Sequence, residues 1–168
     1  MNYNIRLATP DDAEALLGIY SYYVKNTPIS YELEPPTVEE FRHRIEKTLL
    51  HYPYLVAESE GKILGYCYAS RFRERHAYDH CVEVSIYIDK DAHRSGIGSA
   101  LYEELEKRLK AQGVINLCAS ITEEAEPSIR FHAKHGYTKV GHFHKCGRKF
   151  NRWLDMIWMK KFIADHEE

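Results

Sequence analysis

The sequence lacks several features that would mark whole classes of protein. No stretch approaches the ~20 consecutive apolar residues that a helix needs to cross a bilayer, and the N-terminus has no basic start followed by an apolar run. There is no run of lysine or arginine, and the formal net charge is only −2. We therefore expect neither a nucleic-acid nor a membrane partner, and the default location is the cytoplasm.

Cysteine pairs and linkers are also missing. The four cysteines are far apart and form no CxxC pair, which indicates free thiols in a reducing compartment. The chain has no internal repeat, low-complexity tract or linker rich in proline, glycine or serine. With 168 residues, 44% of them hydrophobic, it is predicted to form one domain over residues 1–168 with a substantial core.

Hydrophobic periodicity and helix-capping signals predict the elements in order. Thr9 and Pro10 start the first helix, and Thr37 with Glu40 forms a capping box for the second. The full expectation is a strand over 3–8, helices over 13–25 and 37–52, a hairpin over 53–72, a strand over 80–88, a helix over 97–111, a strand over 113–121, a helix over 127–136 and a strand pair within 137–162. Such an order favours an α+β fold, with a mostly antiparallel sheet and one βαβ crossover.

Residues 88–109, IDKDAHRSGIGSALYEELEKRL, pass from an apolar strand through a glycine loop directly into an amphipathic helix. Gly96 and Gly98 remove side chains beside the first helical turn, whose amides have no partner within the helix. The helix dipole and Arg94 favour an anion there, so a phosphate or pyrophosphate site competes with an ordinary turn. A Walker loop is excluded because Gly-Lys-Ser/Thr is absent, and residues 96–101, GIGSAL, do not match the dinucleotide fingerprint GxGxxG.

The same loop resembles the acetyl-CoA loop of the GNAT superfamily of N-acetyltransferases, Gln/Arg-x-x-Gly-x-Gly/Ala. Here the segment reads HRSGIG, with His93 at the first position. The resemblance spans almost the whole chain and is strongest with the phosphinothricin acetyltransferase branch, through stretches such as YPYLVAESEGKILGYCYAS, RERHAYDHCVEVSIYI, PSIRFHAKHGY and RWLDMIWMKKF. It implies a GNAT fold with a twisted, mostly antiparallel sheet flanked by helices, one βαβ unit that binds acetyl-CoA as co-substrate, and a homodimer.

Two residues are predicted to carry the acid–base chemistry. Glu83 stands between valines in the strand CVEVSIYI, where a carboxylate either faces a wet cleft or lies on a surface edge. Its match to the family's glutamate favours a general base that takes a proton from the substrate ammonium. His132 aligns with a position where many relatives carry the tyrosine that protonates the CoA thiolate, so the resemblance implies a general acid; a histidine on the helix surface is the alternative.

The resemblance also implies a set of cofactor contacts. The main chain of the strand 85–88 is expected to bind the pantetheine arm, and the glycine loop is expected to bind the pyrophosphate, with His93 or Arg94 as the contacting side chain. Ala125 stands where relatives carry an asparagine, which removes one side-chain contact. The predicted cofactor residues are Ser85, Ile86, Tyr87, Ile88, His93, Arg94, Ser95, Gly96, Ile97, Gly98, Ser99, Ala125 and Ser128.

For the acceptor, Tyr31, Arg75 and Tyr78 match family positions that line the substrate cleft. An arginine suits a carboxylate or phosphinate because its planar fork binds two oxygens. The charged segment RFRERH is equally consistent with a solvated loop.

A further group of side chains has metal-ligand chemistry. His142, His144 and Cys146 alternate, so a regular strand would place all three on one face. No fourth ligand is evident, Lys145 adds positive charge, and the aligned family segment has no such triad. No metal site is therefore predicted.

Together these features predict an acetyl-CoA-dependent N-acetyltransferase for the α-amino group of a small amino acid or analogue, of the phosphinothricin or methionine sulfoximine kind. Two alternatives stay open: a module that binds acyl-CoA without catalysis, and an acetyltransferase for protein N-termini or polyamines.

Overall fold

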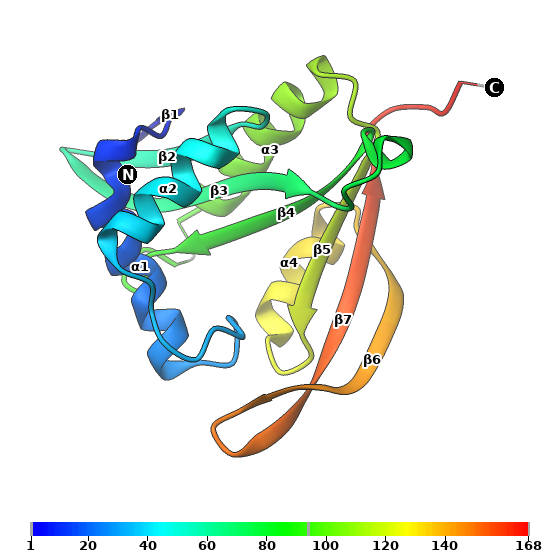
Figure 1. The fold of residues 1–168 in the computed structure, drawn as a ribbon. Helices are drawn as coiled ribbons and strands as arrows, with labels where there is room; N and C mark the ends of the chain where they lie inside the picture. The colour runs from blue at the N-terminus through cyan, green and yellow to red at the C-terminus, as the bar shows by residue number, and fades with distance from the viewer. Residues whose placement is uncertain (1, 94, 168) are drawn as a thin grey trace.

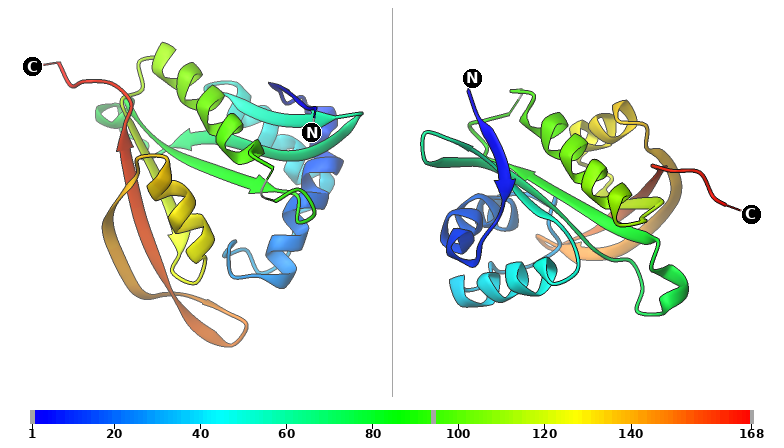
Figure 2. Two further views of the ribbon diagram at one scale, coloured as in Figure 1. Left: turned by 180° about the vertical axis from the view of Figure 1, so that it is seen from behind. Right: turned by 90° about the horizontal axis from the view of Figure 1, so that it is seen from above.

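The computed structural model describes residues 2–93 and 95–167, which fold around one seven-stranded sheet with helices on both faces (Figures 1 and 2). The strand order is β1-β2-β3-β4-β5-β7-β6. The elements are β1 (Asn4–Leu7), α1 (Ala13–Asn26), α2 (Val38–Leu49), β2 (Tyr54–Ser59), β3 (Lys62–Arg71), β4 (Cys81–Ile88), α3 (Ile97–Ala111), β5 (Asn116–Thr122), α4 (Glu126–Lys134), β6 (Thr138–Lys149) and β7 (Arg152–Phe162). The predicted α+β class and element order are confirmed.

The two predicted helix starts differ in detail. At the second, Thr37 Oγ1 accepts from the Glu40 N–H at 3.1 Å, and the Thr37 N–H donates to the Glu40 carboxylate at 2.9 Å, as in a capping box. At the first, a 3₁₀ turn over Pro10–Asp12 precedes α1. The Thr9 N–H donates to the Asp12 carboxylate at 2.8 Å, and the α-helix then begins at Ala13, the first residue of the predicted range 13–25.

Each face of the sheet has its own apolar core, because neighbouring residues of a strand point to opposite faces. Leu55 and Ala57 of β2 pack with α3, whereas Tyr54 and Val56 pack with α1 and α2. On α3, leucines at 101, 105 and 109 are fully buried, as their four-residue spacing predicts. The N-terminus of α3 is therefore held rigidly against the sheet.

The strands β4 and β5 are parallel, joined by α3, and they pair over only three residues each. The pairs run from Cys81 with Asn116 to Glu83 with Cys118. β3, in contrast, pairs with β4 as far as Ile88. Beyond Glu83 the edge of β4 that faces β5 has no strand partner within the described residues, and the two strands diverge in Figure 1.

The hairpin of β6 and β7 contains an irregularity that the sequence did not predict. Phe143 pairs with Met156 and Gly147 with Leu154, so residues 144–146 lie opposite Asp155 alone. Lys145 adopts a φ of 48°, and its N–H donates to Asp155 Oδ1 at 2.8 Å. The expected alternation of His142, His144 and Cys146 on one face is wrong for this reason, and the Cys146 thiol instead points to the Leu154 carbonyl at 3.8 Å.

Two other expectations concern the whole chain. The four cysteines are free, as predicted. Over residues 2–93 and 95–167, no helix has the length and apolar character needed to cross a membrane.

Candidate active site

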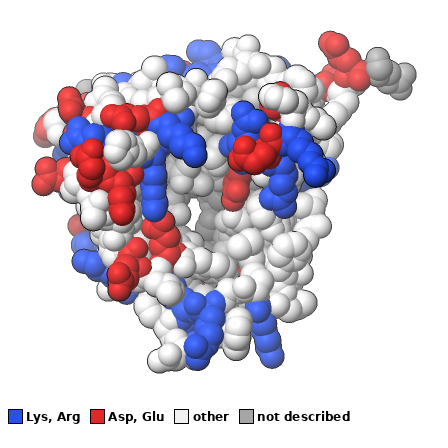
Figure 3. Space-filling view, in the orientation of Figure 1, with Lys and Arg blue, Asp and Glu red and all other residues white. Residues whose placement is uncertain are grey.

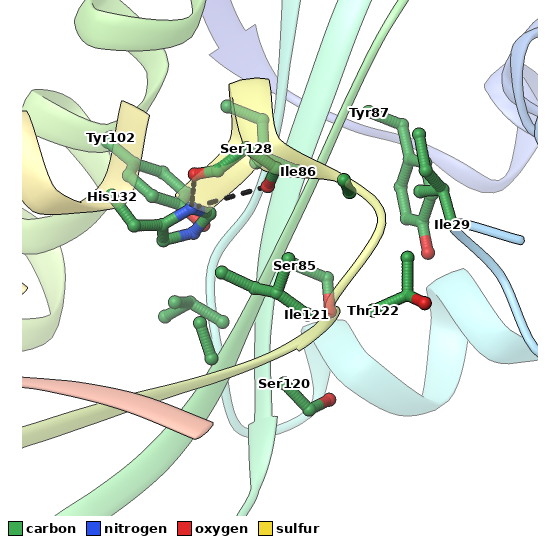
Figure 4. A pocket seen from close by; sticks show the side chains of 13 residues that line it. Ile29, Ser85, Ile86, Tyr87, Tyr102, Ser120, Ile121, Thr122, Ser128 and His132 are labelled. Atoms are coloured by element: carbon green, nitrogen blue, oxygen red, sulfur yellow. Dashed lines mark hydrogen bonds between the residues drawn. The ribbon is translucent and has the colours of Figure 1, made fainter. Parts of the chain in front are cut away.

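Two adjoining hollows occupy the space where β4 and β5 diverge. The first, shown in Figure 4, lies between the two strands and α4, and the second opens toward the loop between α1 and α2. They share Ile29, Ser85, Tyr87, Ser120 and Thr122, so they form one continuous cleft. Figure 3 shows this face of the molecule hollowed, with charged side chains of both signs around it.

Glu83 lines the second hollow from the last position at which β4 pairs with β5. Its side chain is half-buried, and Ser120 Oγ of β5 donates to its Oε1 at 2.7 Å. A carboxylate that reaches a solvent-connected hollow does not incur the cost of a sealed core. The alternation of β4 therefore directs Val82 and Val84 into the core and Glu83 into the cleft.

The loop 27–37, which carries the predicted substrate residue Tyr31, forms the opposite wall of the second hollow and is firmly held. Tyr31 Oη donates to the Asp155 backbone carbonyl at 2.7 Å. Ser30 is buried; its hydroxyl bonds to Tyr20 at 2.7 Å, and its carbonyl accepts from Lys149 Nζ at 2.6 Å. Desolvation lowers the pKa of this buried lysine. The wall beside Glu83 is thus fixed by contacts to α1, β6 and β7.

His132 lies at the far end of the first hollow, on α4, and it is only 3% exposed. Its Nδ1 lies 2.7 Å from the Ser128 carbonyl, and its Nε2 lies 2.8 Å from the Tyr102 hydroxyl (Figure 4). Burial lowers the pKa of His132, which favours the neutral imidazole. Because a carbonyl can only accept, the neutral ring carries its proton on Nδ1, and Nε2 accepts from Tyr102.

The loop before α3 has the conformation of an anion-binding helix start. Gly96 is the N-cap with a φ of 78°, a left-handed conformation that glycine adopts without steric cost. Ser95 Oγ donates to the Ala92 carbonyl at 2.6 Å, which closes the turn. The amides of residues 97–99 begin a fifteen-residue helix, so they are available to a ligand as helix geometry requires.

His93 is turned toward α1, where its Nε2 lies 2.8 Å from the Tyr23 hydroxyl, which in turn donates to the Ile88 carbonyl. The Tyr23 hydroxyl on α1 therefore holds both the end of β4, at Ile88, and the loop, at His93. Arg94, the other predicted phosphate contact, lies outside the described residues.

The comparisons with known proteins agree with this geometry. Residues 5–158 match the family profile described as Acetyltransferase (GNAT) domain. The chain belongs to the GNAT acetyltransferase family. It is therefore an N-acetyltransferase by family, as its sequence predicted.

Individual relatives of this GNAT protein narrow the comparison. A phosphinothricin N-acetyltransferase of Streptomyces viridochromogenes is 36% identical over 94% of the chain and 87% of its own length. An L-methionine sulfoximine/L-methionine sulfone acetyltransferase of Pseudomonas paraeruginosa is 31% identical over 95% of the chain and 94% of its own length. The crystal structure of a phosphinothricin acetyltransferase from Sinorhizobium meliloti in complex with acetyl-CoA superposes with a TM-score of 0.91 at 37% identity, covering 96% of this chain and 89% of the other.

The predicted catalytic and cofactor residues within the described part of this GNAT chain, together with Tyr31, fall into two groups. Those that line the cleft are Tyr31, Glu83, Ser85, Ile86, Tyr87, Ala125, Ser128 and His132. Ile88, His93 and residues 95–99 lie at the end of β4 and the start of α3, where Ser99 Oγ bonds to His135 Nε2 at 2.9 Å. The His135 side chain that makes this bond is half-buried.

Arg75 and Tyr78 are exposed and do not line either hollow. The ring centroids of Tyr78 and Phe72 lie 5.8 Å apart, and those of Phe72 and Trp158 lie 6.1 Å apart. Tyr78 is therefore connected to the cleft side of the sheet only through these two side chains. Trp158 pairs with Ser120, the residue that bonds Glu83. A role for Arg75 and Tyr78 in substrate binding remains a prediction.

The lining residues that the sequence reasoning missed include Tyr102, Ser120 and Thr122. Ser120 and Thr122 alternate with the buried Ala119 and Ile121, so the period-2 pattern of this strand already indicated a polar face directed into the cleft. Tyr102 gave no such signal, because it lies beside Leu101 at an ordinary core position of α3.

Proposed function

We propose that this protein transfers the acetyl group of acetyl-CoA to the α-amino group of a small amino acid or amino-acid analogue. The observation that carries the proposal is the divergence of β4 and β5 beyond Glu83, which leaves a cleft with a carboxylate at one end and a buried imidazole–phenol pair at the other. The phosphinothricin and methionine sulfoximine acetyltransferases among the relatives support an acceptor of this class.

The described residues suit acetyl-CoA, which supplies the activated acetyl group. The N-terminal turn of α3 offers main-chain donors for the pyrophosphate, and the open edge of β4 offers main-chain groups for the pantetheine arm. A Cβ on Gly98 would lie 3.2 Å from Phe131, so a side chain there would crowd α4. Two structures similar to this chain, from Sinorhizobium meliloti and Salmonella typhimurium, contain acetyl-CoA.

Glu83 acts as the base in this proposal. The attacking nitrogen must lose a proton before it can use its lone pair, and the carboxylate faces the hollow that remains open beside Tyr31. Ser120 fixes the Oε1 atom, which leaves Oε2 directed toward substrate or a bridging water.

The departing thiolate needs a proton at the other end of the cleft, where Tyr102 and His132 act as a pair. Since the proton on neutral His132 is held by the Ser128 carbonyl, the imidazole has no free N–H on Nε2. In each turnover His132 Nε2 takes up one proton through the solvent in the cleft, which also receives the protons released by the amine. The Nε2–H then donates to the Tyr102 oxygen while the phenol proton moves to the sulfur, which leaves neutral His132, neutral Tyr102 and the CoA thiol. This relay keeps Tyr102 from remaining as a buried tyrosinate, whose formation is disfavoured because burial holds its pKa well above the usual range.

The acetyl-transfer assay tests the proposal directly. Purified protein with acetyl-CoA and a panel of amines should release CoA with phosphinothricin or methionine sulfoximine, and mass spectrometry should show the acetylated amine. Binding of acetyl-CoA without turnover of any amine would identify a binding module instead. Turnover confined to polyamines or peptide N-termini would overturn the acceptor assignment.

A second prediction concerns the wall at Tyr31. A Cβ at position 147 would lie 2.7 Å from Tyr31 Cε2, so Gly147→Ala displaces this ring from the cleft. We expect kcat/KM for the acceptor to fall about 10- to 100-fold, as for other small misplacements of binding groups, with the KM for acetyl-CoA unchanged. Gly141→Ala on the same strand is the matched control, because its Cβ meets Trp158 at an ordinary 3.7 Å. Equal kinetics of the two variants would contradict the role of Tyr31.

A further inference from the structure

We infer that the hairpin of β6 and β7 carries a site for a divalent transition-metal ion, with zinc as the best fit, formed by His142, His144 and Asp155. This revises the expectation that the chain has no metal site. It is independent of the acetyl-transfer chemistry proposed above.

The three side chains converge because of the irregular pairing at residues 144–146. His142 Nε2 lies 2.8 Å and His144 Nδ1 lies 3.0 Å from the same atom, Asp155 Oδ2. The two imidazole rings stack with their centroids 4.0 Å apart, and the three ligand atoms lie within 4.8 Å of one another. Zinc–nitrogen and zinc–oxygen bonds of about 2.0–2.2 Å with tetrahedral angles place ligand atoms about 3.3 Å apart, so small shifts of these side chains would admit an ion.

The carboxylate is prepared for this role by the backbone. The Lys145 N–H holds Oδ1 at 2.8 Å, which leaves Oδ2 directed at both imidazoles. A hydrogen bond that orients a metal-binding carboxylate is a recurrent feature of protein metal sites.

Access and charge also favour a cation. The His144 side chain is 75% exposed, so an ion can enter from solvent. Glu123 Oε2 lies 3.9 Å from His142 Nε2 and can supply the fourth ligand. Lys139 Nζ opposes binding, since it lies 3.4 Å from His142 Nδ1. Two imidazoles with one or two carboxylates are a ligand set typical of zinc.

The site adjoins the cleft through the main chain. The Asp155 carbonyl accepts the Tyr31 hydroxyl, and Lys145 and Asp155 fix the pairing of β6 with β7. An ion bound here would therefore stiffen the hairpin that supports the Tyr31 wall.

Zinc titration of the untagged full chain, after dialysis against EDTA, tests the inference. Calorimetry should give one zinc per chain with micromolar or tighter affinity. At a free zinc concentration of about 100 Kd, the melting temperature should rise by about 5–10 °C. His144→Ala should weaken binding at least about tenfold, and its exposed position makes correct folding straightforward to verify by circular dichroism.

Control variants separate this site from other zinc ligands. Cys146→Ser and His43→Ala, an exposed histidine on α2, should bind zinc as the unchanged protein does. Lys139→Gln should bind more tightly, because it removes the opposing charge. Zinc binding that survives both His142→Ala and His144→Ala would overturn the inference. So would binding of less than about 0.2 zinc per chain at about 10 μM free zinc, ten times a Kd of about 1 μM.

Discussion

Replacement of Glu83 by glutamine should reduce kcat/KM for the acceptor by about 10²- to 10⁴-fold near neutral pH, the usual contribution of a general base. The glutamine Oε1 can still accept from Ser120 Oγ, so the substitution removes the charge and retains the hydrogen bond. The loss in kcat/KM should become smaller as the pH rises toward the pKa of the acceptor ammonium, because more of the acceptor is then already deprotonated in solution. Steady-state kinetics across a pH series provide the measurement.

Ser120→Ala serves as the companion variant for Glu83. It leaves the carboxylate in place and removes only the group that orients it, so a loss of about tenfold is expected, the lower end of the scale for a hydrogen bond to a charged group. Glu60→Gln, in the turn between β2 and β3, should behave as the unchanged protein. Full turnover by Glu83→Gln at neutral pH would exclude the proposed base.

Removal of the Tyr102 hydroxyl should have the second large effect. We expect Tyr102→Phe to lower kcat by about 10²-fold, because general acids contribute on this scale, while the KM for acetyl-CoA changes little. His132→Asn should lower kcat to a similar extent. If the two residues act as one relay, the double variant should be little worse than either single variant.

Stability must be measured beside the kinetics of these variants. Tyr102→Phe leaves the buried Nε2 of His132 without its donor, which costs about 1–3 kcal/mol of unfolding free energy. Tyr137→Phe is a matched control. Tyr137 is also buried, and its ring centroid lies 5.1 Å from that of His132, but its hydroxyl makes no hydrogen bond to this histidine. Strictly additive losses in kcat, or equal losses for Tyr137→Phe, would refute the relay.

Local rules predicted most of the elements of this fold. The capping box at Thr37, the leucine spacing of α3 and the apolar, β-branched run of β4 each depend on residues within a few positions of one another, and each was confirmed in the structure. The resemblance to GNAT enzymes then assigned the family and directed attention to Glu83.

The parts that escaped prediction depend on contacts between distant residues. Cys146 was expected to lie beside His142 and His144, but Asp155, on the next strand, distorts the pairing by accepting the Lys145 N–H. The hydrogen bond between Tyr102 and His132 Nε2 joins residues thirty positions apart, which no spacing rule connects. Neither contact leaves a signature in a window of adjacent residues.

The closeness of Gly147 to Tyr31 has an evolutionary consequence. One position on the hairpin must stay without a side chain for as long as the loop between α1 and α2 presents an aromatic ring. A bulkier residue at 147 is compatible only with a smaller one at 31. With Tyr31 proposed to line the acceptor site, a change of acceptor preference at this wall would involve both segments, and a transplanted loop with an aromatic ring at position 31 would need a host with glycine at position 147.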